Sequence, residues 1–189
     1  MDPNQFRGAI GQFTSGVTVI TCQGADDQPH GVTCTAVTSI SLDPRLCLLS
    51  INRKSAACGK LGSNGPFAVN ILASDQADTA MSFAGRPERT EPRWIDGTGA
   101  PLLEGAAATI SCVTIWREYD GGDHSIFLGE VVEAQSSGGD PLLFYRRSFD
   151  LGATLSTTVW GLQDEPHDGW FDATTYITPI DLIPGPQTI

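Results

Sequence analysis

The chain has 189 residues, and its 22 acidic and 11 basic side chains give a formal charge of −11. Hydrophobic residues make up 40% and charged residues 17%, which is typical of a compact domain and excludes a wholly disordered chain. Nucleic acids and anionic membranes are held largely through basic side chains, so this acidity argues against both as partners. No run of 18 apolar residues occurs, and residues 1–5 resemble no secretory signal, so we expect a cytoplasmic protein without membrane spans.

The cysteines are widely spaced and form no CxxC motif. They are Cys22, Cys34, Cys47, Cys58 and Cys112. This spacing argues against a zinc site, and we expect no metal. We interpret the cysteines as small buried apolar residues in a reducing compartment.

The first predicted element is a short amphipathic helix over residues 3–14, with Asp2 as its cap. The apolar face of this helix consists of Phe6, Ile10 and Phe13. Three strand-like segments follow, over residues 17–22, 30–38 and 46–51. A polar turn joins the first two segments into a predicted hairpin, and the third is apolar throughout, which favours a central position.

The second half of the chain continues the pattern of strands. We predict strands over residues 67–72, 109–116, 125–134 and 141–144. A short helix with Asp75 as its cap is predicted over residues 75–83. Many strands with few short helices predict an antiparallel barrel over residues 1–149. Residues 150–189 are acidic and contain aromatic residues, so we interpret them as a C-terminal extension rather than a second domain.

Three segments carry residues with binding chemistry. Residues 31–44 are rich in small and hydroxyl side chains, which let a flat ligand approach the backbone, although a Thr-rich strand has the same composition. Residues 52–55 place two bases and a serine after a strand, a pattern that binds phosphate or merely forms a solvated turn. Asp123 and His124 follow two glycines, where an imidazole can contact a ligand or simply occupy the turn.

Eight short motifs in register then resemble the short-chain flavin reductase family over roughly residues 5–149. The motifs lie at residues 6–7 with 16–21, 31–33, 38–44, 67–72, 83–85, 101–105, 122–131 and 141–145. The resemblance implies a mainly β, FMN-binding split β-barrel, antiparallel and Greek-key-like, with a few short helices. It also implies a homodimer that uses NADH or NADPH to reduce FAD or FMN for a partner monooxygenase.

The resemblance implies catalytic roles for His124, near the nicotinamide, and for Asp123. It implies cofactor-binding roles for Thr33, Cys34, Thr35, Ala36, Val37, Thr38, Ser39, Ser50, Asn52, Arg53, Lys54, Ser55, Phe83, Ala84, Gly85, Arg86, His124 and Tyr145. Two groups of bases, Arg53, Lys54 and Lys60 together with Arg86, Arg89 and Arg93, lie in or beside these segments. We therefore expect the bases to mark the place of an anionic cofactor.

The sequence departs from the family pattern at Thr35, Ala36 and Ala57, where side-chain polar groups are lost. These changes leave two alternatives open. One is a flavin-reductase-like scaffold that carries out a non-reductase step, the cyclisation or oxidation of a polycyclic aromatic intermediate in a biosynthetic pathway. The other is a flavin-binding or partner-docking module without catalysis.

Overall fold

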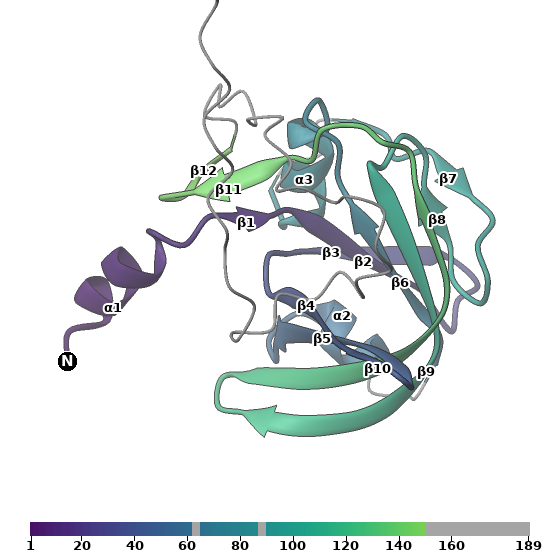
Figure 1. Ribbon diagram of the computed structural model, residues 1–189, viewed down its shortest axis with the longest axis horizontal. Helices are drawn as coiled ribbons and strands as arrows, with labels where there is room; N and C mark the ends of the chain where they lie inside the picture. Colours follow the sequence, from purple (N-terminus) through teal and green to yellow (C-terminus); the bar gives the residue numbers. More distant parts are fainter. Residues whose placement is uncertain (62–64, 87–89, 150–189) are drawn as a thin grey trace, which may run out of the picture. The chain divides into compact units, whose positions relative to one another are not determined.

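The computed structural model describes residues 1–61, 65–86 and 90–149, all within one compact unit of the chain, Met1–Ala153. The predicted extension at 150–189 lies outside the described residues. Within the described residues, the strands form a strongly curled antiparallel sheet with short helices at its margins (Figure 1). None of the helices in this described part has the length and hydropathy needed to span a bilayer.

A seven-stranded sheet forms the body of the molecule, in the spatial order β3-β2-β6-β9-β10-β5-β4. Its strands are β2 (Thr18–Gln23), β3 (Pro29–Cys34), β4 (Val37–Leu42), β5 (Arg45–Asn52), β6 (Phe67–Ile71), β9 (Ala108–Gly121) and β10 (His124–Ser136). All neighbouring pairs are antiparallel, which confirms the predicted barrel class.

The remaining elements lie around this sheet. A three-stranded sheet contains β1 (Ser15–Gly16), β11 (Leu143–Tyr145) and β12 (Ser148–Phe149), and a two-stranded one contains β7 (Trp94–Ile95) and β8 (Leu102–Leu103). The helices are α1 (Pro3–Ile10), α2 (Ala56–Leu61) and α3 (Ala77–Phe83). Figure 1 shows α1 standing away from the barrel, beside the end at which β11 and β12 meet.

The predicted strand over residues 30–38 is wrong in one respect, because the chain leaves it at Thr35 and Ala36. Residues 29–34 pair with β2 as β3, whereas residues 37–42 pair with β5 as β4. The two strands therefore follow each other in sequence but form opposite edges of the same sheet. Threonines favour extended backbone on both sides of the link. Composition alone therefore does not reveal that the paired strand changes from β2 to β5.

Most other element boundaries agree with the prediction to within a few residues. Helix α1 ends at Ile10 rather than at residue 14, and Asp2 caps it as predicted by accepting a 3.0 Å hydrogen bond from Asn4 N. The predicted cap Asp75 is wrong: the residue at the N-cap of α3 is Gln76, and it makes no side-chain capping bond. Strand β9 extends five residues beyond its predicted end, to Gly121, and forms one long hairpin with β10, whose ends agree with the prediction to within two residues.

The core fills the inside of the curled sheet. One apolar cluster includes Ile20, Leu49, Phe67, Cys112 and Phe127, and a second packs α3 against β2 and the residues around β11. Asn70 is fully buried, yet all its polar atoms are paired: Nδ2 donates to Val19 O and Thr21 Oγ1, and Oδ1 accepts from Leu103 N at 2.8 Å. This amide joins β2, β6 and β8 on one side of the barrel.

Candidate functional site

The link between β3 and β4 lies over β5. Ala36 O accepts a 3.0 Å hydrogen bond from Ser50 N, which holds the link on the strand beneath. Cys34, at the end of β3, is buried and its Sγ donates to Ser50 O at 3.4 Å. Thr33 Oγ1 donates to Ala80 O of α3 at 2.6 Å. The side chains of Thr33 and Cys34 therefore position the link, and Thr35 and Ala36 are exposed.

A cavity of about 660 Å³ opens beside this link, which is within the usual size of small-molecule sites. One wall consists of Thr35, Ala36, Val37, Thr38 and Leu48. The rest of the lining comes from α1, the chain after it, β1, β11 and the turn between β11 and β12, and consists of Arg7, Ile10, Gly11, Phe13, Ser15, Phe144, Arg146 and Arg147. Four predicted cofactor residues thus lie together against largely apolar side chains, while Ser39 lies on β4 outside this lining.

A second group forms where the β9–β10 hairpin meets the end of β5. Asn52 is the register partner of His124, and Arg53 N donates to Asp123 O at 3.1 Å. The turn that follows is held by Asn52 Oδ1, which accepts from Lys54 N at 2.9 Å. The structure therefore brings residues 52–55 and 123–124 together, although they lie far apart in the sequence.

The histidine of this group is held by its neighbour. His124 Nδ1 donates to Asp123 Oδ1 at 2.6 Å, which fixes one tautomer of the imidazole. That hydrogen bond, with the nearby imidazole, holds the pKa of the Asp123 carboxyl below its ordinary value. Asp123 is therefore ionised at neutral pH and orients a partly exposed imidazole.

One of the predicted phosphate-binding bases, Arg53, has a partner within the protein. Arg53 Nη2 lies 2.6 Å from Asp120 Oδ1, so part of its charge is used within the protein. Neither residues 52–55 nor His124 belongs to the lining of the cavity. The predicted site therefore consists of two neighbouring surfaces joined by β5.

The predicted cofactor-binding residues 83–86 begin at the end of α3. Phe83 packs edge-on against Trp94, with ring centroids 5.8 Å apart. Phe83 also lies against Gly31 of β3, where an added Cβ would lie 2.7 Å from the Phe83 ring. Phe83 is thus a packing residue between α3 and β3. Ala84, Gly85 and Arg86 follow on the surface, with Gly85 at a φ of +71° that a glycine adopts without strain.

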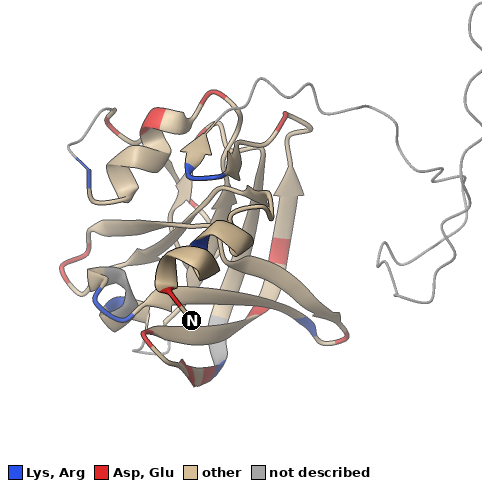
Figure 2. Cartoon of the chain, turned by 90° about the vertical axis from the view of Figure 1, so that its left-hand side faces the viewer, with Lys and Arg blue, Asp and Glu red and all other residues tan. Residues whose placement is uncertain are grey.

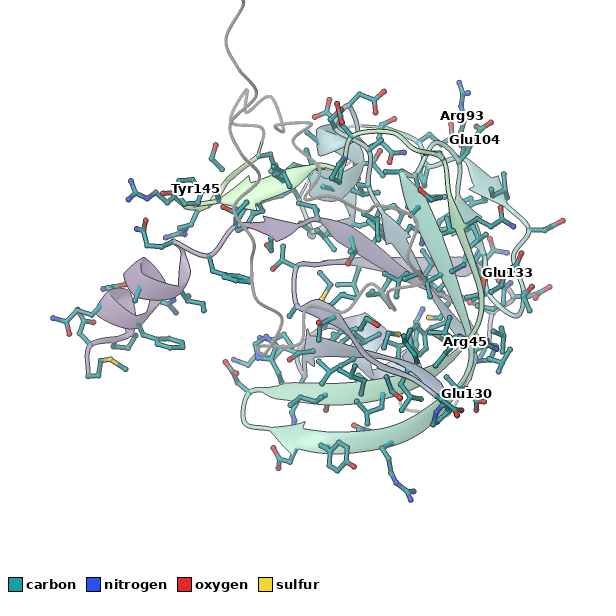
Figure 3. All side chains as sticks on the ribbon, in the orientation of Figure 1. Arg45, Arg93, Glu104, Glu130, Glu133 and Tyr145 are labelled. Atoms are coloured by element: carbon teal, nitrogen blue, oxygen red, sulfur yellow. The ribbon has the colours of Figure 1, made fainter. Side chains whose placement is uncertain are left out.

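Tyr145 lies at the end of β11 on the side of the molecule that carries α1 (Figure 3). Its hydroxyl donates to Gln12 Oε1 at 3.1 Å, and the same oxygen accepts from Arg146 Nη2 at 2.8 Å. Tyr145 thus contributes to the cavity by holding the chain after α1. Arg7, Arg146 and Arg147 were missed by the sequence analysis, because two segments about 140 residues apart converge only in the folded chain.

The cavity fits a flavin on the evidence of its own residues. Small and apolar side chains line it on both sides, as a flat aromatic ring requires, and guanidinium groups at its rim match the charge of a phosphate. The residues that would hold the ring are 35–38 and Leu48.

A model of the flavin reductase like domain matches residues 10–152. An NADH-dependent flavin reductase of a Rhodococcus species is 39% identical, with 78% of this chain and 85% of that protein aligned. The reductase component of a 4-nitrophenol 4-monooxygenase/4-nitrocatechol 2-monooxygenase from Rhodococcus opacus is 35% identical, over 85% of this chain and 86% of the relative.

A solved structure agrees with these matches in fold. The Streptomyces globisporus NADH:FAD oxidoreductase SgcE6, in complex with NAD and FAD fragments, superposes with a TM-score of 0.74 at 36% identity, covering 82% of this chain and 95% of that one. The antiparallel split barrel, the cavity beside the β3–β4 link and these matches agree, and the chain belongs to the family of flavin reductase like domains.

Proposed function

We propose that the protein is a flavin reductase that uses NADH to reduce FAD or FMN and supplies the reduced flavin to a separate monooxygenase. The observation that carries this proposal is the family match across the whole described barrel, together with the cavity beside the β3–β4 link. The relatives reported above are an NADH-dependent flavin reductase and a reductase component of a monooxygenase. NADH is therefore the reductant we propose, with NADPH to be tested beside it.

The residues of the chain bind and align the two ring systems. Residues 35–38 and Leu48 hold the flavin ring against apolar walls, and small side chains let the backbone approach its polar edge. Bound flavin supplies the hydride acceptor, its N5 atom, for the hydride on C4 of the nicotinamide. His124, oriented by Asp123, positions the nicotinamide, while Arg53, Lys54 and Ser55 offer donors to a phosphate.

The test is NADH oxidation by the purified protein with FAD, FMN or riboflavin, followed by the loss of NADH absorbance. We expect turnover that requires added flavin, and faster product formation by a flavin-dependent monooxygenase when this protein is added. Absence of turnover with all three flavins would contradict the proposal. The proteins compared above give no support to a non-reductase step on a polycyclic aromatic, and no observation favours that alternative.

We also propose that the protein acts as a homodimer in the cytoplasm, where NADH is available. Apolar side chains of α1 and of the chain after it support the dimer: Phe6, Ile10 and Phe13 are exposed by 56%, 57% and 76%. Strand β4 is an edge of the main sheet and exposes Leu42 by 51%. Exposed apolar side chains on a helix and on an edge strand are typical of a subunit interface.

A further inference from the structure

Three arginines, which we call the arginine rim, are among the residues that line the cavity. Arg7 comes from α1, while Arg146 and Arg147 form the turn between β11 and β12. Among the described residues no carboxylate lies within 4.0 Å of these three groups, in contrast to Arg53, which pairs with Asp120. Their charge is therefore available to a ligand in the cavity.

The turn that carries two of them has an unusual backbone. Arg146 has a φ of +47° and Arg147 a φ of +69°, the left-handed region that Asn and Gly favour in two-residue hairpins. Residues with backbone strain of this kind cluster at binding sites, where the surrounding structure holds them in place. Arg146 has a second duty, because its Nε and Nη2 donate to Gln12 Oε1 at 3.2 and 2.8 Å. Arg7 has a longer contact, in which its Nη1 donates to Asn4 Oδ1 at 3.5 Å.

The electrostatic setting favours an anion at this place. The chain carries a charge of −11, and acidic residues mark most of its loops, whereas basic residues occur in a few separate places (Figure 2). A cluster of three arginines is thus an exception within an acidic surface. Guanidinium groups bind phosphate oxygens in a planar, bidentate manner, which suits a group with several such oxygens.

The cavity joins this charge to an apolar surface. Ile10, Phe13 and Phe144 line the same wall as the arginines, so the site offers aromatic and aliphatic contacts beside an anion-binding rim. A ligand that satisfies both carries an aromatic ring and phosphate, and three guanidinium groups offer enough donors for the two phosphates of a diphosphate. FAD and NADH share this chemistry in their adenosine diphosphate half, whereas FMN has one phosphate and riboflavin has none.

We propose that Arg7, Arg146 and Arg147 bind the diphosphate of a dinucleotide and so favour dinucleotides over FMN. This inference rests on the proposed flavin reductase function and names the substrate feature that the rim of the cavity recognises. Residues 52–55 lie outside the cavity lining, which leaves them for another phosphate contact.

The test is the double variant Arg7→Gln and Arg147→Gly. Gln keeps helix propensity at position 7, and Gly relieves the positive φ at position 147, so neither change weakens the fold. Arg146 is retained because it also holds Gln12. The readouts are the Kd values of FAD, FMN and riboflavin from fluorescence titration, the KM for NADH, and inhibition by ADP.

We expect the Kd of FAD to rise about tenfold or more, with riboflavin unchanged and FMN changed less than FAD. If NADH is the dinucleotide bound here, its KM and the inhibition constant of ADP rise instead, and the flavin affinities stay the same. Either result supports the proposal. Unchanged binding of both dinucleotides, an equal loss for riboflavin, or an equal loss for FMN would overturn it.

The matched control is Arg117→Gln, which removes one positive charge from an exposed position of β9 outside the cavity. Equal effects of this control and the cavity variants would show a general charge effect and overturn the proposal. The binding readouts need no turnover. A wild type that binds FAD but does not oxidise NADH would therefore contradict the reductase function while leaving this test readable.

Discussion

Gly129 gives the core of the barrel room for two sulfur atoms and a phenyl ring. It lies on β10 opposite Cys47, and a Cβ at this position would lie 2.3 Å from Phe67 Cζ and 3.1 Å from Cys112 Sγ. The sulfurs of Cys47 and Cys112 approach to 3.5 Å beside it. A side chain of any size at Gly129 would displace buried groups that have nowhere to move.

We therefore expect Gly129→Ala to lower the free energy of unfolding by about 1–3 kcal/mol, because overpacking shifts Phe67. Urea denaturation measures this change. The control is Gly139→Ala, where the added Cβ meets Ser137 Oγ at an ordinary 3.5 Å and the expected change is within about 0.5 kcal/mol. Equal losses in the two variants would contradict the packing argument.

Asp123 offers a test of how the imidazole is positioned. Asp123→Asn removes the charged acceptor of the 2.6 Å hydrogen bond from His124, and both side chains lie at the surface. We expect the KM for NADH to rise about three- to tenfold, with the free energy of unfolding nearly unchanged. Steady-state kinetics and urea denaturation check the two statements, and an unchanged KM would show that the pair has no part in nicotinamide binding.

The buried thiol of Cys34 makes the free energy of unfolding depend on pH in the alkaline range. Burial raises the pKa of its thiol above the ordinary value of 9.0. Above pH 9 the unfolded chain therefore loses this proton first, so it binds fewer protons than the folded chain, and the free energy of unfolding falls as pH rises. Well below pH 9 both states keep the proton and the group has no such effect.

We expect Cys34→Ala to have a shallower loss of stability between pH 8 and about pH 10 than the wild type, whatever its stability at neutral pH. Urea denaturation at a series of pH values measures the two slopes. Parallel curves for the two proteins would show that this thiol does not ionise on unfolding.

At the scale of elements, helix α1 is the part with the least burial. Every residue of the helix is exposed, and its sequence nevertheless has a cap, a proline in the first turn and an apolar face. Isolated helices of this length are marginal in water. The helix therefore needs a surface to cover its apolar face, and the proposed second subunit would provide it.

We expect Phe6→Glu to shift the protein from two chains toward one, because a carboxylate replaces an apolar contact at the proposed interface. Light scattering after size exclusion measures the mass against the 20.1 kDa of one chain. Gln5→Ala, at the neighbouring position, is the control and should leave the mass unchanged. A wild type with the mass of one chain would contradict the homodimer.

Most elements could be predicted from local patterns, and the errors have physical reasons. The run from Thr18 to Gln23 and the run from Phe67 to Ile71 are apolar and β-branched, so their strands were found within a residue or two. The change of partner at Thr35 and Ala36 depends on which strand lies beside each half, and this is a non-local property. Long-range pairing likewise sets the end of β9, where exposed residues from Arg117 to Gly121 continue the ladder with β10.

At the scale of the whole molecule, salt should act in opposite directions on folding and on binding. A chain of charge −11 repels itself, so screening favours the compact state, whereas the attraction of an anionic ligand to arginines is weakened. We expect 0.3 M NaCl to raise the free energy of unfolding by about 0.5 kcal/mol relative to 0.05 M and to raise the Kd of FAD several-fold. Urea denaturation and flavin titration at both salt concentrations test this. A free energy of unfolding that falls with salt, or a Kd of FAD that does not rise, would contradict it.

The candidate site was only partly visible in the sequence. Segments 35–38, 52–55 and 123–124 could be named because each carries its chemistry within a few residues, and the structure brings the last two together through β5 and β10. The arginine rim could not be named. Arg7 lies near the N-terminus, the turn of Arg146 and Arg147 lies some 140 residues later, and only folding makes them neighbours.

The link at Thr35 and Ala36 also determines how far the barrel can open. Strands β3 and β4 are opposite edges of the sheet, and no ladder joins them among the described residues. At this end the seam between them is held by the covalent link and by the hydrogen bonds of Cys34 and Ala36 to Ser50. Three residue steps from Cys34 to Val37 span at most about 11 Å when fully extended. Thermal fluctuations can therefore separate the linked ends of β3 and β4 only up to that distance. The link thus limits the width of the opening beside it, where a planar molecule would lie.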